Sequence, residues 1–140
     1  WKNDFSTYQK IIEQNNLADN IILHNKFIPH EDVKYYFDAS DLVILPYKRI
    51  YQSGVLLMAL SYEKPVLASD LLPLKEILID NKTGFLFKSE DINDLTEKIK
   101  IILSNEKKLE KIRKRGALLA RQEFNWNKIA IVIKQAYQTL

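Results

Sequence analysis

The stretch PYKRIYQSGVLLMALSYEKPVLASDLLPLKE, residues 46–76, decides how this chain is interpreted. Its pattern predicts a loop, a helix, a buried strand, a second loop and the start of another helix. The first loop ends in Gln52, Ser53 and Gly54, at the point where the backbone N–H groups of a helix N-terminus lack partners. Unpaired donors and the positive end of the helix dipole attract anions, above all phosphates. The stretch therefore predicts a phosphate site.

Composition indicates a globular protein of ordinary size. The 140 residues are 46% hydrophobic and 28% charged, and they form one expected domain, residues 1–140. No run of 18 apolar residues is available for a transmembrane helix, and the first residues lack the apolar core of a signal peptide. The chain has no cysteine and a net charge of +3, so we expect a cytoplasmic protein that tolerates anionic ligands.

Short apolar runs alternate with segments of helical periodicity along the chain. The runs predict strands over residues 21–23, 42–45, 65–68 and 85–87. The periodic segments predict helices over residues 4–17, 30–38, 53–62, 73–78, 91–103, 106–122 and, within the terminal segment 124–140, 126–140. Asp91 has the character of an N-cap.

Continuous apolar strands that alternate with helices are typical of a parallel sheet covered on both faces. The predicted fold class is therefore α/β, a Rossmann-like three-layer α/β/α domain. Ligands of such sheets bind beyond the carboxyl ends of the strands. The loop over residues 46–54 follows the end of one predicted strand and leads into a helix, which is the expected place for the phosphate site.

The order of motifs resembles the C-terminal half of glycosyltransferases with the GT-B architecture, in the retaining family numbered four. The family is known for a series of short motifs in a fixed order. The matching segments here are FIP at 27–29, YFDASDL at 36–42, LPY at 45–47, EKPVLASD at 63–70, EIL at 76–78, NKTGFLF at 81–87 and FNW at 124–126.

The chain departs from this family at the residues that usually contact the donor. Family members carry two glutamates separated by seven residues, one for the donor sugar and one for the ribose. Ile50 and Met58 stand at those places here. The segment QSGV, residues 52–55, resembles a subgroup of the family in which the phosphate role rests on the backbone. A further departure is Glu63, which replaces a glycine.

The resemblance and the loop position together give the candidate site. Lys48 and Arg49 would neutralise a diphosphate leaving group, although solvated loop cations would look the same in sequence. Ser69 and Asp70 follow a strand end, where two roles are open, lining the pocket or capping the next helix, and we expect capping. The predicted phosphate-binding residues are Gln52, Ser53, Gly54, Lys48 and Arg49. The predicted lining of the nucleotide pocket is Tyr47, Val55, Met58 and Glu76.

No cofactor and no metal are expected. His24 and His30 are not spaced with other ligands, and no Asp-x-Asp motif, dinucleotide fingerprint or Walker loop is present in the sequence. The basic run over residues 107–121 usually marks a solvated helix face. Its alternative is contact with anionic lipid headgroups at the inner membrane face, near a lipid-linked acceptor. Nucleic acid is not favoured, because the aromatic residues of the chain lie at core spacings and not among these cations.

The implied function is that of the donor domain of a retaining glycosyltransferase of bacterial surface polysaccharide synthesis. Its partners would be a nucleotide-sugar donor and the N-terminal acceptor domain of the same enzyme, which lies outside this chain; alone, the chain would be inactive. No catalytic residue is assigned. Two alternatives stay open at this point. One is a non-catalytic nucleotide-binding module, and the other is an α/β interaction domain of the receiver type.

Overall fold

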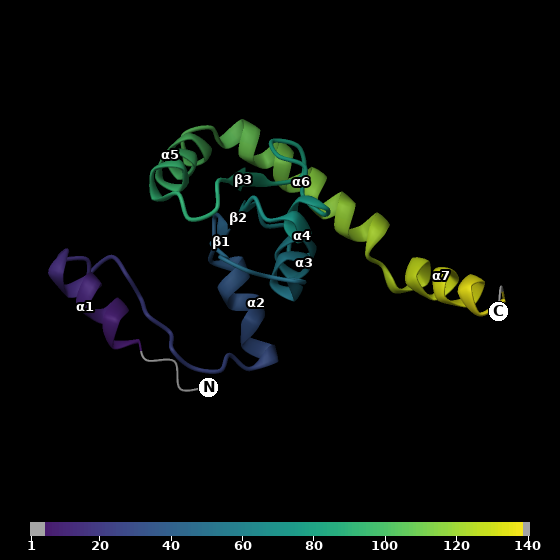
Figure 1. The fold of residues 1–140 in the computed structure, drawn as a ribbon, viewed down its shortest axis with the longest axis horizontal. Coiled ribbons are helices and arrows are strands. Elements are labelled where there is room, and N and C mark those ends of the chain that lie inside the picture. Colours follow the sequence, from purple (N-terminus) through teal and green to yellow (C-terminus); the bar gives the residue numbers. More distant parts are fainter. Residues whose placement is uncertain (1–4, 139–140) are drawn as a thin grey trace. The chain divides into compact units, whose positions relative to one another are not determined.

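A computed structural model describes residues 5–138 of the chain. Its internal contacts divide the chain into two units, Trp1–Val33 and Lys34–Leu140. Figure 1 labels the elements in chain order. The expectation of a single domain over residues 1–140 stays a prediction.

The first unit contains α1, Ser6–Gln14, which is shorter than the helix expected over residues 4–17. The strand expected over residues 21–23 is absent, and this prediction was wrong. Ile22 is 86% exposed in an irregular segment. Three apolar residues adopt a strand only where a neighbouring strand supplies hydrogen bonds, and the described residues pair none with them. The predicted helix at residue 30 is confirmed as α2, His30–Asp38, which runs into the second unit.

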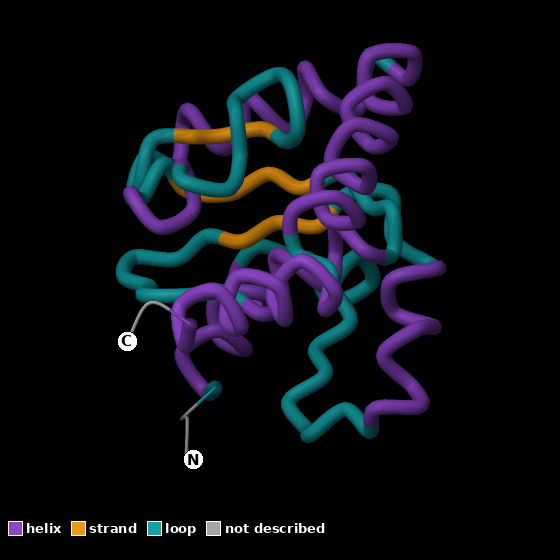
Figure 2. The backbone as a smooth tube through the Cα atoms, turned by 90° about the vertical axis from the view of Figure 1, so that its right-hand side faces the viewer, coloured by secondary structure: helices purple, strands orange, loops and turns teal. Residues whose placement is uncertain are grey.

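The second unit is built on a parallel sheet in the order β1-β2-β3, formed by β1, Val43–Leu45, β2, Val66–Ser69, and β3, Phe85–Phe87. Figure 2 shows the three strands side by side with helices around them. The central strand β2 is buried along its whole length. Continuous apolar runs therefore identified all three strands correctly.

Two helices cover one face of this sheet. They are α5, Ile92–Leu103, and α6, Glu106–Glu123. The Asp91 side chain caps α5 as predicted, because it accepts hydrogen bonds from the first N–H groups of the helix. A buried cluster joins these helices to the sheet, and its members are Leu67, Phe85, Phe87, Ile102 and Ile112.

Helix α3, Gly54–Ser61, contacts both β2 and α6. Val66 and Ala68 alternate with the clustered Leu67, so they point to the opposite face of the sheet, and both are fully buried. Both faces of β2 are thus covered, and the α/β class with a parallel sheet is confirmed. A single turn, α4, Leu72–Lys75, follows β2.

The last helix is α7, Trp126–Gln138, where the helix over 126–140 was expected; residues 139–140 lie outside the described part. None of its residues is buried, and Trp126 is 83% exposed. Within residues 5–138, no helix combines the length and the apolar character that crossing a membrane requires.

Candidate functional site

The predicted phosphate loop lies at the carboxyl edge of the sheet, between the end of β1 and the start of α3. Ser53 is the N-cap of α3, with extended backbone angles of φ −127° and ψ 100°. Its Oγ accepts a hydrogen bond from the N–H of Leu56 at 3.2 Å. The cap thus satisfies one N–H of the first turn, whereas the N–H groups of Gly54 and Val55 have no helix carbonyl within reach to accept from them.

A set of hydroxyl groups fixes the loop to the sheet. The Ser69 hydroxyl, fully buried at the end of β2, donates to the carbonyl of Tyr47 at 2.8 Å and also lies 3.4 Å from the carbonyl of Leu45. The Ser89 hydroxyl reaches the same Tyr47 carbonyl at 3.5 Å. The Tyr47 hydroxyl lies 3.4 Å from Ser53 Oγ. These contacts between neutral groups fix the position of the loop.

The predicted cations lie on the same loop. Lys48 Nζ forms an ion pair with Glu90 Oε2 at 3.3 Å, and the two side chains are 79% and 63% exposed. They border a cavity of about 240 Å³ lined by Pro46, Tyr47, Lys48, Phe87, Glu90, Asp91, Ile92 and Leu95. Arg49 and Gln52 are exposed, and no ion pair involves Arg49 in the described part of the chain.

The residues predicted to line the nucleotide pocket are brought together only in part. Tyr47 is partly buried beside Ser53, and Val55 lies exposed in the first turn of α3. Met58 is partly buried farther along the same helix. Glu76 is exposed at the C-cap of α4, and within residues 5–138 no hydrogen bond or ion pair joins it to the loop.

The capping role expected of Ser69 and Asp70 was wrong. The N-cap of α4 is Leu71, whose position has no side-chain cap. Asp70 Oδ1 instead accepts from the N–H of Ser89 at 2.9 Å. Both residues therefore tie neighbouring loops of the carboxyl edge together. Sequence reasoning missed Ser89 and Glu90 entirely, because the turn that follows β3 carries no local motif.

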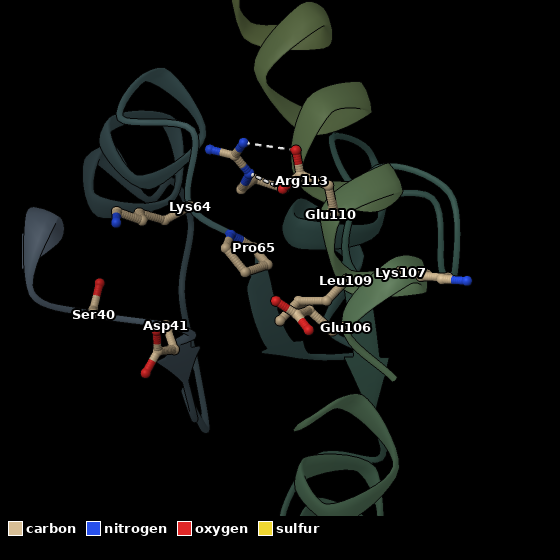
Figure 3. Close-up of a pocket in the computed structure, with 9 residues that line it drawn as sticks. All are labelled: Ser40, Asp41, Lys64, Pro65, Glu106, Lys107, Leu109, Glu110 and Arg113. Atoms are coloured by element: carbon tan, nitrogen blue, oxygen red, sulfur yellow. Dashed lines mark hydrogen bonds and ion pairs between the residues drawn. The ribbon is translucent and has the colours of Figure 1, made fainter. Parts of the chain in front are cut away.

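The amino edge of the sheet holds a second cavity, of about 430 Å³, between the starts of β1 and β2 and one face of α6 (Figure 3). Its lining mixes both signs of charge. The residues are Ser40, Asp41, Lys64, Pro65, Glu106, Lys107, Leu109, Glu110 and Arg113.

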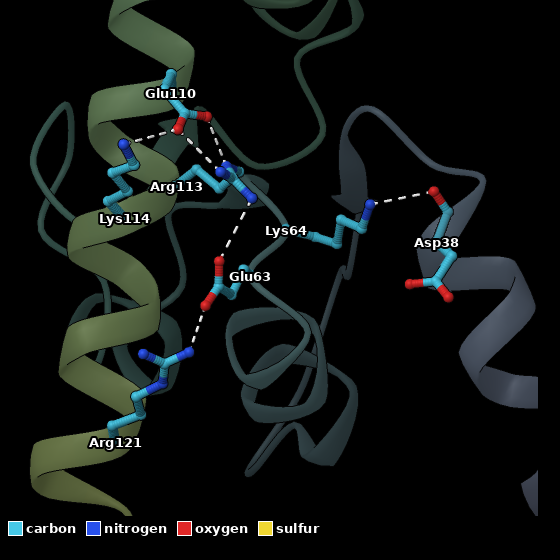
Figure 4. A network of polar contacts seen from close by, with 7 residues as sticks. All are labelled: Asp38, Glu63, Lys64, Glu110, Arg113, Lys114 and Arg121. Carbon is cyan, nitrogen blue, oxygen red and sulfur yellow. Dashed lines mark hydrogen bonds and ion pairs between the residues drawn. The ribbon is translucent and has the colours of Figure 1, made fainter.

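Ion pairs join this edge to α6 (Figure 4). Glu63, at a left-handed φ of 56°, pairs with Arg113 at 3.4 Å and with Arg121 two turns further along α6. Arg113 also donates to both oxygens of Glu110, at 2.7 and 2.9 Å. These hydrogen bonds, together with one from Lys114, lower the pKa of the Glu110 carboxyl from 4.5 to about 2.

These pairs change how the basic run on α6 is understood. Arg113, Lys114 and Arg121 are engaged with glutamates. Among the described residues, no ion pair involves Lys107 or Lys111. Only part of the run therefore faces solvent as free charge.

No group of three or more His, Asp or Glu side chains within residues 5–138 is arranged to hold a metal ion.

Solved structures place the fold among glycosyltransferases of the GT-B architecture. Sucrose-phosphate synthase from Thermosynechococcus elongatus matches with a TM-score of 0.86 at 26% identity, over 96% of this chain and 33% of that chain. HepE of Anabaena, solved in complex with UDP, matches with a TM-score of 0.86 at 21% identity, over 96% and 36%. The C-terminal domain of LpcC, a group 1 glycosyltransferase of Francisella tularensis, matches with a TM-score of 0.79 at 19% identity, over 86% and 62%.

The family model of glycosyl transferases group 1 matches residues 2–118, and the chain belongs to this family. A relative, the uncharacterised glycosyltransferase MJ1178 of Methanocaldococcus jannaschii, is 26% identical over 98% of the chain and 39% of its own length. The chain thus spans little more than a third of this relative. The resemblance to the C-terminal half of GT-B glycosyltransferases is confirmed, and membership of the retaining family numbered four stays a prediction.

Proposed function

We propose that this chain is the donor-binding part of a glycosyltransferase and holds the diphosphate of a nucleotide sugar at the N-terminus of α3. The observation that carries the proposal is the position of Ser53. Its hydroxyl caps α3 at the carboxyl edge of the sheet, uses the N–H of Leu56, and leaves those of Gly54 and Val55 for a ligand. Oriented N–H donors at a helix start are a common phosphate site.

Related structures support a nucleotide-sugar ligand. HepE was solved with UDP and with UDP-glucose, and its chain superimposes on this one with TM-scores of 0.86. At 20–21% identity this is a likeness of fold, and by analogy we propose a nucleotide sugar as the ligand of this chain.

The chemistry proposed for this site is electrostatic. During transfer the bond between the sugar and the diphosphate breaks, and a new bond forms to an acceptor hydroxyl. Backbone N–H groups, Lys48 and Arg49 would stabilise the negative charge that collects on the departing diphosphate, without a metal ion. Because Ile50 and Met58 cannot accept hydrogen bonds from sugar hydroxyls as carboxylates do, sugar recognition would depend on other groups.

The wider context of the reaction belongs to the same proposal. The acceptor would bind to a further domain of the enzyme, and the present part alone would be inactive. We propose a retaining transfer in the synthesis of bacterial surface polysaccharides, on the cytoplasmic side of the membrane. Free cations such as Lys107 and Lys111 would support peripheral contact with anionic lipid. Cosedimentation with vesicles containing phosphatidylglycerol tests this contact.

Titration with UDP and UDP-glucose, followed by amide NMR, tests the donor site. We expect the largest shift changes at residues 52–55. The variant that tests the role of the loop is Gly54→Ala. An added Cβ at Gly54 meets no protein atom within 4 Å, so we expect this variant to keep the fold intact. Such a methyl group would stand where a phosphate approaches the backbone and should weaken binding.

Binding without any transfer by the full-length enzyme would favour the non-catalytic module. Absence of shift changes at millimolar nucleotide, with UDP and with GDP, would reject the donor site and favour an interaction domain.

A further inference from the structure

We propose that Glu90 is an electrostatic latch on the donor site: it holds Lys48 in the free protein and releases it to the diphosphate of the donor. The inference rests on the proposed function, because it describes how the same site is regulated. It assigns a role to a residue from the turn after β3, a segment that the motifs of the chain do not connect with the site.

The two partners come from loops that the structure binds together. Lys48 follows β1 and Glu90 follows β3, and their side chains meet at 3.3 Å at the carboxyl edge of the sheet. Ser89, the neighbour of Glu90, donates its N–H to Asp70 at 2.9 Å and lies with its hydroxyl 3.5 Å from the Tyr47 carbonyl. The ion pair thus connects two anchored loops.

The backbone at Glu90 gives a second, independent observation. Its φ is +62°, in the left-handed region where glycine or asparagine is favoured and where a glutamate is strained. Such a conformation persists only where the surrounding structure holds it, and it is found more often at functional segments than elsewhere. The next residue, Asp91, is already used, because its carboxylate caps α5 and pairs with Lys88 at 3.5 Å. Glu90 is therefore the carboxylate of this turn that reaches Lys48.

Both side chains of the Lys48–Glu90 ion pair are mostly exposed, which suits an ion pair that has to dissociate when the donor binds. Ion pairs with both side chains mostly in solvent contribute little to stability. A diphosphate presents more negative charge and more acceptor oxygens than one carboxylate, so it competes well for the same ammonium group. Lysine has a long flexible stem that can turn from one anion to the other. The latch therefore weakens donor binding slightly and keeps the cation near the site.

A double-mutant cycle on the 140-residue chain tests the latch, with UDP affinity measured by NMR titration at low ionic strength. Glu90→Gln should tighten UDP binding about threefold, in keeping with the small energy of an exposed pair. The gain should fade at high salt because screening weakens exposed charges. Uridine, which has no phosphate, should bind equally to both proteins. In a Lys48→Met background, Glu90→Gln should leave UDP affinity unchanged.

Two further variants control for other causes. Glu97→Gln removes an exposed glutamate of α5 and changes the net charge equally, so it should leave UDP affinity unaltered. Glu90→Gly removes the carboxylate while relieving the left-handed backbone, so it should fold well and tighten binding as Glu90→Gln does.

The outcomes separate the latch from the donor site. Suppose that the unaltered chain binds UDP. The latch is then overturned, while the donor site stands, if Glu90→Gln leaves UDP affinity unaltered as Glu97→Gln does, or if it lowers that affinity. The same conclusion follows if Glu90→Gln still raises UDP affinity in the Lys48→Met background. If the unaltered chain does not bind UDP at all, both proposals fail.

Discussion

The two edges of the sheet hold their polar groups in opposite ways. At the amino edge charged side chains pair with one another, as Glu63 does with Arg113 and Arg121. At the carboxyl edge neutral hydroxyls bind backbone carbonyls, as Ser69 does with Tyr47. Lys48 and Arg49, the cations of the loop over residues 46–54, remain exposed. Of these two, only Lys48 has an ion-pair partner among the described residues.

This difference separates a stabilising edge from a binding edge. Charges that satisfy each other have little left for a ligand, whereas a loop fixed by hydroxyls keeps its backbone donors and cations accessible. Substitutions at the amino edge should therefore change the free energy of unfolding, and substitutions at the carboxyl edge should also change ligand affinity.

The sharpest test of this contrast uses two glycines. A Cβ at Gly116 of α6 would lie 2.7 Å from the carbonyl oxygen of Thr83 and 2.8 Å from a methyl group of Leu60, whereas Gly54 has open space. We expect Gly116→Ala to lower the free energy of unfolding by about 2 kcal/mol, as overpacking does. Gly54→Ala should leave it within about 0.5 kcal/mol. Urea denaturation measures both, and equal losses would contradict the contrast.

Two helix caps provide the next comparison. Ser53 caps α3 at the binding edge, and Asn105 caps α6 by accepting from the N–H of Lys108 at 3.0 Å. Replacing either residue with alanine should cost about 1 kcal/mol of stability. Only Ser53→Ala should also weaken UDP binding in an NMR titration. An equal loss of affinity in Asn105→Ala would show that the effect is general destabilisation.

The ion pairs of the amino edge should contribute less. Arg113→Met removes the partner of Glu63 and Glu110 and should lower stability by about 0.5–1 kcal/mol, discounted because the Arg113 side chain is one-third exposed. Lys107→Met, on the same helix without an ion pair among the described residues, should change stability less. UDP affinity should be unaltered in both, and a loss of affinity in Arg113→Met would break the separation of the two edges.

The smallest expected effect concerns pH. The pKa of Glu110 in the folded chain, about 2, lies below the ordinary value of 4.5. A depressed carboxyl pKa stabilises the folded state above pH 4.5, and this contribution is lost as pH falls from 4.5 towards 2. The drop in Tm on acidification should therefore be shallower in Glu110→Gln than in the unaltered chain. Parallel Tm curves for the two proteins would contradict this role.

Local patterns predicted much of this fold. The apolar runs gave all three strands, although only β2 is buried along its whole length and Ile44 of β1 is 37% exposed. Ser53 and Asp91 cap helices because capping depends on a few adjacent residues. Residues 21–23 are similarly apolar but pair with no strand among residues 5–138, so the pattern alone was insufficient.

Only the part of the candidate site that lies on a single loop was predictable from the sequence. Lys48 and Ser53 lie on a single segment, and their place at the end of a strand is local information. The pair of Lys48 with Glu90 spans 42 residues, and the pair of Glu63 with Arg113 spans 50. Such partners depend on how the strands are ordered, which no periodicity in the sequence specifies.

Helix α7 has a practical consequence for every titration proposed above. It carries Trp126, Ile133 and Tyr137, all three exposed, and none of its described residues is buried. Exposed apolar surface of this kind favours association between molecules as concentration rises. We therefore expect line widths and light scattering to depend on protein concentration. UDP affinities are best compared at one fixed, low protein concentration, so that a spectral change caused by ligand binding is not confused with one caused by self-association.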